Sequence, residues 1–317
     1  MSTPRYISLD GRLVPFDDAK IHVLSPAVRY GATVFEGICG YWNEDERRTH
    51  VFRLKEHLVR LQHSMRLMRF DAAYSLDQLT DTVLELVAAN DFDTDCHIRL
   101  SAYVIGDPGI ANIAATGPIG LICAAIPRKP RALEARAITC GISSWRRIDD
   151  SDMPPRIKAA ANYQNGRLGL LQARADGYNE VLFLTGAGKL AEGAGACFFM
   201  IRDGKPSTPE TTHSILESIT RDTLIRLFKE YFGSPVEERT IDRTETYIAD
   251  EAFLCGSGYE IAPITSIDRL PIGAGQVGPK TRALWEKYDQ ITRGLIADHA
   301  EWRTPVAAAQ AAKRQAS

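Results

Sequence analysis

The amino-acid sequence predicts a two-domain protein of the α+β class. The chain has 317 residues, about twice the roughly 150 residues of a typical domain. Helical and strand patterns lie beside one another in the first third of the chain, and a proline-rich segment separates that third from a longer second part. Hydrophobic residues make up 44% of the chain and charged residues 25%, so the chain can bury a large core.

The first part of the chain contains two predicted helices and two predicted strands. Apolar residues recur at helical spacing in two stretches, the second of which has Ser75 as a candidate N-cap. The positions are Leu58, Leu61, Met65 and Met68, then Leu76, Leu79, Val83, Leu86 and Val87. Residues 97–105 alternate between apolar and polar, and 119–126 form a nearly continuous apolar run. Both patterns predict strands.

Segment 127–134 (PRKPRALE) is the predicted domain boundary, because two prolines and a cluster of cations cannot easily continue a strand. We expect a small N-terminal domain at 1–126, an interdomain loop at 127–136, a large C-terminal domain at 137–303 and a flexible tail at 304–317. In the large domain, strands are predicted near 137–143, 180–184, 197–201 and 252–254, and helices near 162–176, 221–232 and 281–298.

Charge and cysteine content exclude several classes of protein. The formal net charge is −2, whereas a nucleic-acid binder needs an excess of basic surface. The six cysteines are scattered without a C-x-x-C pair, which fits neither a zinc site nor a small secreted scaffold. No signal peptide or membrane-spanning apolar run is visible. We therefore expect a soluble cytoplasmic protein without a metal, nucleic-acid or membrane partner.

Lys158 is the first candidate for covalent chemistry. Three alanines (159–161) and then Asn162-Tyr163 follow it. Small apolar neighbours can partly desolvate a lysine, which lowers the pKa of its amine and frees the lone pair to attack a carbonyl. Lys158 is therefore a candidate Schiff-base lysine. The alternative is a solvated lysine near a helix start.

Glu192 is a single carboxylate within Ala191-Glu-Gly-Ala-Gly-Ala196. Its small neighbours allow a ligand to approach the backbone and meet one negative charge. The alternative is an exposed acid in a glycine-rich turn. The spacing does not match the dinucleotide-binding fingerprint.

The segment Ser218-Ile219-Thr220-Arg221 precedes a predicted helix that ends at Gly233. The unpaired N–H groups of a helix start, together with a hydroxyl, suit an anion such as phosphate. The alternative is that Thr220 serves as an N-cap and nothing more. A second small-residue turn, Cys255-Gly-Ser-Gly258, could supply further backbone donors.

These motifs occur in an order that resembles the class IV (fold type IV) pyridoxal-phosphate aminotransferases, and among them the branched-chain amino-acid aminotransferases. The resemblance covers almost the whole chain, to about Trp302. Its markers are YGATVFEG at 30–37, EHLVRL at 56–61, Lys158 with Asn162-Tyr163, EGAG at 192–195, LESITR at 216–221 and GSG at 256–258. It implies a D-amino-acid aminotransferase-like fold, in which a small α/β domain joins a larger β-barrel-like domain with helices.

The resemblance also implies how pyridoxal 5'-phosphate is held. Lys158 forms the Schiff base and moves the proton during transfer. Glu192 faces the pyridine nitrogen, and Tyr163 hydrogen-bonds the phenolic oxygen of the ring. The phosphate site is implied to consist of Arg60, Ser218, Ile219, Thr220 and Ser257. For Arg60 the alternative is a surface charge on an amphipathic helix.

The implied substrate pocket departs from the family pattern at several positions. The positions that match the family pocket are Tyr30, Phe35, Gly37 and Arg99, and Ser257 with Gly258 is implied to bind the α-carboxylate. Arg99 is implied to pair with the distal carboxylate of glutamate or 2-oxoglutarate. Cys39, however, replaces an arginine, His97 a tyrosine and Cys197 an asparagine of the family.

Loop 128–134 lacks the aromatic residues that cover the family pocket. Its cations, Arg128 among them, are either ligands for an acidic substrate or solvated.

The resulting hypothesis is a transaminase that moves the amino group of a branched-chain or related L-amino acid to 2-oxoglutarate. Within the same fold, the alternatives are an (R)-amine or D-amino-acid transaminase and an aminodeoxychorismate lyase. From another class, the alternative is a catalytically silent homologue that binds the cofactor. The resemblance further implies a homodimer or a higher oligomer.

Overall fold

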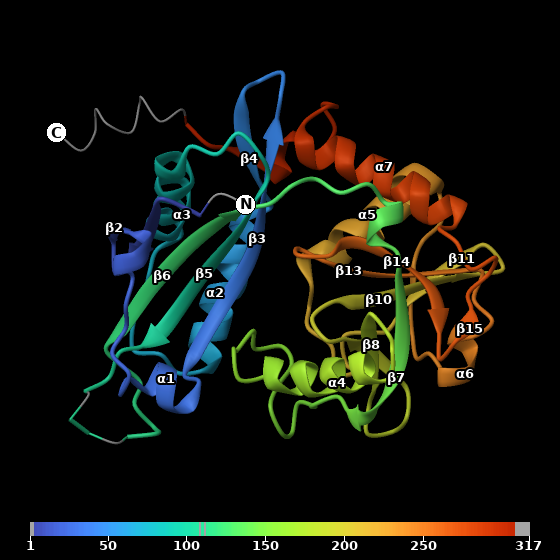
Figure 1. Ribbon diagram of the computed structural model, residues 1–317, viewed down its shortest axis with the longest axis horizontal. Helices are drawn as coiled ribbons and strands as arrows, with labels where there is room; N and C mark the ends of the chain where they lie inside the picture. The colour runs from blue at the N-terminus through green and yellow to red at the C-terminus, as the bar shows by residue number, and fades with distance from the viewer. Residues whose placement is uncertain (1–2, 108, 111, 308–317) are drawn as a thin grey trace. The chain divides into compact units, whose positions relative to one another are not determined.

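The computed structural model describes residues 3–107, 109–110 and 112–307, and these fall into two compact units (Figure 1). Unit 1 takes its residues from 1–130, 157–161 and 290–317, and unit 2 from 131–156 and 162–289. This division differs from the predicted one in two segments. The stretch around Lys158 and the chain beyond residue 289 belong to unit 1, because both add short strands or contacts to its sheet.

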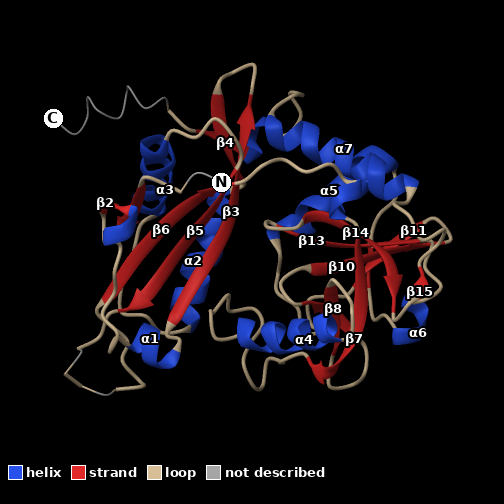
Figure 2. Cartoon of the chain, in the orientation of Figure 1, coloured by secondary structure: helices blue, strands red, loops and turns tan. Residues whose placement is uncertain are grey.

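Unit 1 is built on a seven-stranded sheet in the order β16-β4-β3-β5-β6-β1-β2, in which each paired strand is antiparallel to its neighbour. Figure 2 shows these strands in red. Their bounds are β1 Tyr6–Leu9, β2 Arg12–Pro15, β3 Thr33–Asn43, β4 Arg48–Phe52, β5 Cys96–Val104, β6 Ile119–Pro127 and β16 Arg303–Pro305.

Helices α2 (Leu54–Leu67) and α3 (Leu76–Asn90) pack on one face of this sheet. The apolar stripes read from the sequence supply the buried contacts, and Ser75 with Gln78 forms a capping box at the start of α3. A third helix, α1 (Pro26–Tyr30), ends at Gly31, whose φ of +69° suits glycine. The two predicted helices and the two predicted strands, β5 and β6, are therefore confirmed.

Unit 2 contains a nine-stranded mixed sheet that closes on itself. The strand path is β12-β11-β10-β13-β14-β7-β8-β9, and β9 also pairs with β10. Six strands, from β10 round to β9, thus form a closed barrel, which confirms the β-barrel-like domain. The bounds are β7 Ile138–Arg146, β8 Glu180–Leu184, β9 Leu190–Gly193, β10 Cys197–Arg202, β11 Lys205–Thr208, β12 Glu237–Glu238, β13 Glu251–Gly256, β14 Glu260–Ile267 and β15 Leu270–Pro271.

The helices of unit 2 are α4 (Tyr163–Ala175), α5 (Ile219–Phe232), α6 (Arg243–Thr246) and the first part of α7 (Pro279–Arg293). Phe228 of α5 stacks on Phe199, which in turn stacks on Phe253 with ring centroids 5.1 Å apart. These rings attach α5 to β10 and β13. Helix α7 ends five residues earlier than predicted, where Gly294 adopts a φ of +72°.

The predicted flexible tail is wrong at its beginning. Residues 303–305 form β16, which pairs with β4 and extends the unit 1 sheet. Residues 308–317 lie outside the described part of the chain. No helix among the described residues is long and apolar enough to cross a membrane.

Candidate active site

Lys158 lies in unit 1, beside the N-terminal end of β3. Its backbone carbonyl accepts a hydrogen bond from Phe35 N at 3.0 Å, and Ala159 pairs with Val34 in an isolated bridge. On the other side, Lys158 N donates to Ser64 Oγ of α2 at 3.2 Å. The residue is only 9% exposed, so the alternative of a solvated lysine is wrong. Its amine lies 4.9 Å from the centre of the Phe35 ring.

Arg60 turns inward from α2 and binds Glu36, which is 0% exposed. Arg60 Nε donates to Glu36 Oε1 at 2.8 Å, and Arg60 Nη2 donates to Glu36 Oε2 at 2.7 Å. The alternative of a surface charge is therefore wrong. His57 Nδ1 is also 2.7 Å from Glu36 Oε2. The sequence interpretation gave no role to Glu36 or His57, although an acid inside an apolar strand was a signal.

Neighbouring positive charge keeps the buried carboxyl group of Glu36 ionised. Burial alone raises the pKa of Glu36, but the charge and hydrogen bonds of Arg60, with help from His57, lower the pKa to about 2. Burial lowers the pKa of His57 despite its hydrogen bond to Glu36. A carboxylate thus fixes the orientation of the Arg60 guanidinium.

Several of the predicted substrate residues lie in one row on the opposite face of β3 and on the neighbouring strand β5. Arg99 pairs with Gly37 in the strand register but stacks on the ring of Phe35, with its guanidinium carbon 3.4 Å from the ring centre. His97 lies over Gly37, where an added Cβ would come within 3.0 Å of Nε2. Each β5 side chain thus leans diagonally along β3, as cross-strand neighbours can.

Arg128 continues this row from the end of β6. Its guanidinium carbon lies 5.8 Å from the centre of the Tyr41 ring, and its side chain hydrogen-bonds the Cys39 thiol. Burial lowers the pKa of His97 to about 4, and the charges of Arg128, Arg99 and Lys158 act in the same direction. His97 is therefore a neutral imidazole among cations at neutral pH. Tyr30 ends α1 and stacks with Arg29.

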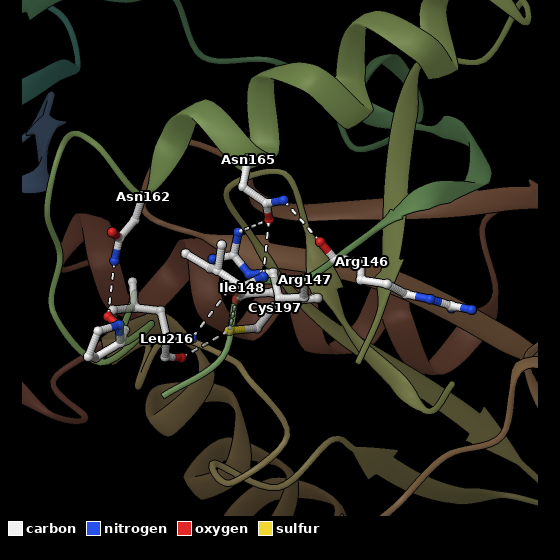
Figure 3. Close-up of polar contacts among 9 residues, drawn as sticks. Arg146, Arg147, Ile148, Asn162, Asn165, Cys197 and Leu216 are labelled. Carbon is white, nitrogen blue, oxygen red and sulfur yellow. Dashed lines mark hydrogen bonds and ion pairs between the residues drawn. The ribbon is translucent and has the colours of Figure 1, made fainter. Parts of the chain in front are cut away.

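In unit 2, Glu192 lies at the end of β9 and is 3% exposed, so the exposed-acid alternative is wrong. Its Oε1 accepts hydrogen bonds from Arg147 Nη2 at 2.7 Å and from Leu216 N at 3.3 Å. Cys197 lies directly across the β9–β10 pairing, with Sγ 3.6 Å from Oε2. Figure 3 shows Arg147, Cys197 and Leu216 gathered in this cluster, below Asn165 of α4.

Tyr163 is the first residue of α4 and lies against the same glycine-rich turn. An added Cβ at Gly195 would be 3.4 Å from Tyr163 Cε1. Helix α4 can approach so closely because Gly166 lacks a side chain, since a Cβ there would lie 2.3 Å from Ala194 O. Unit 2 therefore brings Tyr163 to the turn that begins at Glu192.

The start of α5 has a different N-cap from the one considered in the sequence. Ser218 Oγ accepts from Arg221 N at 3.3 Å, so Ser218 is the cap and the interpretation of Thr220 as an N-cap is wrong. Ile219 and Thr220 are the first two residues of the helix, where N–H groups have no intrahelical acceptor. Ser257 and Gly258 lie in the turn that follows β13.

Each unit thus presents its own group of candidate residues. Unit 1 gathers around β3 one amine, three guanidinium groups and two imidazoles, those of Lys158, Arg60, Arg99, Arg128, His57 and His97. Unit 2 gathers a buried carboxylate, a phenol and a helix start around a closed barrel. Unit 1 thus pairs a buried lysine with arginines that suit anions, and unit 2 pairs a buried carboxylate with a helix start that suits an anion, as enzyme sites do.

Comparison with known proteins identifies the family. Residues 33–267 match the family model described as amino-transferase class IV. A probable branched-chain-amino-acid aminotransferase of Aquifex aeolicus is 37% identical over 298 residues, which cover 94% of this chain and 95% of the relative. The chain therefore belongs to the class IV aminotransferases, enzymes that depend on pyridoxal phosphate.

Solved structures agree with this assignment. The branched-chain amino acid aminotransferase of Thermobaculum terrenum, in its PLP form, has a TM-score of 0.89 and 40% identity, with 97% of this chain and 100% of that chain covered. The branched-chain aminotransferase of Thermoproteus uzoniensis with norvaline has a TM-score of 0.90 and 39% identity, with 96% and 100% covered.

Proposed function

We propose that this enzyme moves the amino group of a branched-chain or related L-amino acid to 2-oxoglutarate, with pyridoxal phosphate bound to Lys158. The observation that carries the proposal is the Phe35 ring, on which the amine of Lys158 and the guanidinium of Arg99 both lie. A group that reacts with carbonyls and a group that recognises carboxylates thereby share one face of unit 1. The curated relatives of similar length carry branched-chain names, which favours this donor class over the alternatives.

The donor groups of the chain fit pyridoxal phosphate in kind. A buried amine suits its aldehyde, a buried carboxylate suits its pyridine nitrogen, and a phenol suits its ring hydroxyl. A guanidinium and a helix start suit its phosphate. We assign the amine, carboxylate and phenol roles to Lys158, Glu192 and Tyr163. We assign the phosphate-binding role to Arg60, Ser218, Ile219, Thr220 and Ser257. When bound, the cofactor supplies an electron sink for the substrate carbanion.

The protein groups divide the remaining work. With the cofactor bound, Lys158 Nζ would take the proton from Cα of the amino donor and, in the second half of the transfer, would give a proton to Cα of the acceptor. Glu192, as a carboxylate, would hold the ring nitrogen of the cofactor and favour its protonated form. Glu36 fixes the orientation of Arg60, whose guanidinium would hold the cofactor phosphate. Ser257 and Gly258 are proposed to donate N–H groups to the substrate α-carboxylate.

For the acceptor, we propose that two arginines bind the distal carboxylate of 2-oxoglutarate. Arg99 is held over Phe35, and Arg128 hydrogen-bonds the thiol of Cys39, where the family has an arginine. The Arg128 guanidinium therefore supplies a positive charge next to position 39, where this chain has a cysteine in place of the family's arginine. Tyr30, Phe35 and Gly37 are proposed to line the adjacent side-chain pocket.

This assignment of Arg128 predicts a selective defect in Arg128→Leu. We expect KM for 2-oxoglutarate to rise about tenfold or more, because a charge-assisted hydrogen bond is worth roughly 1.5–3 kcal/mol. KM for pyruvate, which lacks the distal carboxylate, should change less than about threefold on the same principle. Steady-state kinetics with both acceptors measure the difference, and Lys129→Leu, an exposed cation in the same loop, is the control. Equal rises for both acceptors would contradict the role.

We further propose a homodimer in the cytoplasm. Large apolar side chains are exposed on unit 1, including Ile113 at 75% and Val23 at 70%, and such residues favour a protein interface. All six cysteines are buried free thiols, which suits a reducing compartment. Light scattering coupled to size-exclusion chromatography measures the oligomeric state.

A donor panel tests the function. The cofactor-loaded enzyme is supplied with L-leucine, L-valine, D-alanine, (R)-1-phenylethylamine and L-glutamate, with 2-oxoglutarate or pyruvate as acceptor. We expect the highest kcat/KM with L-leucine or L-valine and 2-oxoglutarate. Activity confined to (R)-amines or D-amino acids would overturn the donor assignment. No turnover with any donor would indicate the silent homologue.

A further inference from the structure

The contact between Arg147 and Glu192 links two residues 45 positions apart, and no sequence pattern indicated it. Arg147 directly follows β7, and its backbone N donates to Leu184 O of β8 at 2.9 Å. Its Nη1 donates to Asn165 Oδ1 of α4 at 3.2 Å. Asn165 also holds the turn itself, because its Nδ2 donates to Arg146 O at 3.0 Å. Contacts with α4, β8 and β9 thus fix the guanidinium beside Glu192, and Figure 3 shows Arg147 next to Asn165.

Stability alone does not account for the ion pair between Arg147 and Glu192. Both side chains are buried, and Arg147 Nε has no hydrogen-bond partner within the described part of the chain. Buried ion pairs with an unsatisfied donor seldom stabilise a fold more than apolar residues of similar volume. A functional role accounts for Arg147 better than a contribution to stability does.

The surroundings of Glu192 explain what that role is. A carboxyl group in a dry barrel is favoured in its protonated form, in which it donates a hydrogen bond and cannot accept one from a protonated ring nitrogen. The charged group in contact with Glu192 is Arg147, whereas the charge of Arg221 of α5 acts on the neighbouring thiols of Cys197 and Cys255. Arg221 is already bound to Glu238 at 2.6 Å. Arg147 is therefore the cation that compensates Glu192.

Cys197 makes the two oxygens of Glu192 unequal. Oε1 accepts from Arg147 and from Leu216 N, whereas Oε2 faces the Cys197 thiol, a weak donor. Burial and the charge of Glu192 raise the pKa of Cys197 to about 12, so the group stays a thiol. An asparagine amide in its place would be a stronger donor to Oε2.

We infer that Arg147 is a positioning residue for the proposed reaction. It keeps Glu192 ionised and holds Oε1, so that Oε2 is the oxygen presented to the cofactor nitrogen. The inference rests on the proposed role of Glu192, but the link between Arg147 and the Glu192 charge can be measured without cofactor.

The test compares Arg147→Met with Arg146→Met. Arg146 is the exposed neighbour, and its side chain extends away from the cluster in Figure 3. In the cofactor-free Arg147→Met protein, Glu192 loses its counter-charge and its pKa in the folded state rises. A raised folded-state pKa gives stability at low pH that is lost as pH increases. We expect the unfolding temperature of Arg147→Met to fall below that of Arg146→Met by about 5 °C more at pH 8 than at pH 5.

In the cofactor-loaded protein, Arg147→Met should lower kcat with L-leucine by at least about tenfold and change KM less than about threefold, because the lost interaction acts in the transition state. Arg147→Lys keeps the charge and should recover most of the loss, as well as the pH behaviour of the wild type. It also carries the test if Arg147→Met does not fold, because a lysine cannot reach Asn165 and Glu192 together and should still lower kcat by about two- to threefold.

Two results would overturn the inference. One is a difference in unfolding temperature that does not change with pH, and the other is kcat within twofold of wild type in Arg147→Met. If the wild type itself transferred no amino group, the proposed function would fail. In that case, a difference in unfolding temperature between Arg147→Met and Arg146→Met that increases from pH 5 to pH 8 would still support Arg147 as the residue that keeps Glu192 ionised.

Discussion

Lys158→Ala is expected to lose transaminase turnover by at least about 10⁴-fold. The amine is the nucleophile for the cofactor carbonyl and the group that moves the Cα proton, and general acid–base catalysis alone contributes about 10²–10⁴-fold. Lys158 Nζ lies 4.9 Å from the centre of the Phe35 ring. The measurement is kcat with L-leucine and 2-oxoglutarate at saturating cofactor.

Two controls separate chemistry from folding in this experiment. Lys55→Ala removes an exposed lysine from α2 and should leave kcat within twofold. Lys158→Ala should keep the unfolding temperature near that of the wild type, because the substitution leaves the backbone bonds of residue 158 to Phe35 and Ser64 in place. A folded Lys158→Ala protein with turnover near wild type would contradict the mechanism.

Glu36→Gln is expected to cause the largest loss of stability, about 3–5 kcal/mol. The substitution leaves the inward-facing Arg60 guanidinium with a neutral partner, and the cost of an uncompensated buried charge is of this size. Arg60 also loses its fixed orientation, so cofactor affinity should fall. Urea unfolding of the cofactor-free protein measures the free energy of unfolding. The double variant Glu36→Gln with Arg60→Met should recover part of the loss, because it removes the orphaned charge.

The same variant has a defined pH signature. The folded-state pKa of Glu36 is about 2, against an ordinary value of 4.5, so its stabilisation is present above pH 4.5 and disappears as pH falls toward 2. The shift corresponds to about 3 kcal/mol at 1.36 kcal/mol per unit. Glu44→Gln, which breaks an exposed ion pair with Arg47, is the control and should cost less than about 1 kcal/mol. A difference between the two variants that persists unchanged at pH 2.5 would contradict the assignment.

Local patterns were enough to predict most of the elements. Neighbouring residues are enough to indicate the apolar stripe of α3, its cap at Ser75 and the apolar run of β8. The barrel class followed from the family resemblance. Strand β3 was not predicted, because Glu36 and the glycines interrupt its apolar pattern, although it is buried along most of its length. Strand β16 was not predicted, because its three residues are too few to show the alternation of apolar and polar side chains that indicates a strand.

The site was predictable where chemistry and sequence neighbours coincide. The alanines after Lys158 indicated burial, and the glycines after Glu192 indicated close approach. The partners of these residues could not be predicted from local sequence. Glu36 meets Arg60 from 24 positions away, and Arg147 meets Glu192 from 45 positions away. Such pairs depend on strand register and helix packing, which a local pattern does not contain.

The half-reaction with L-leucine tests the central claim most directly. Cofactor-loaded enzyme is mixed with L-leucine in the absence of any acceptor, and 4-methyl-2-oxopentanoate is quantified by chromatography. We expect about one molecule of this oxo acid per active site, followed by one molecule of L-glutamate per site when 2-oxoglutarate is added. Absence of the oxo acid, with or without acceptor, would contradict the account.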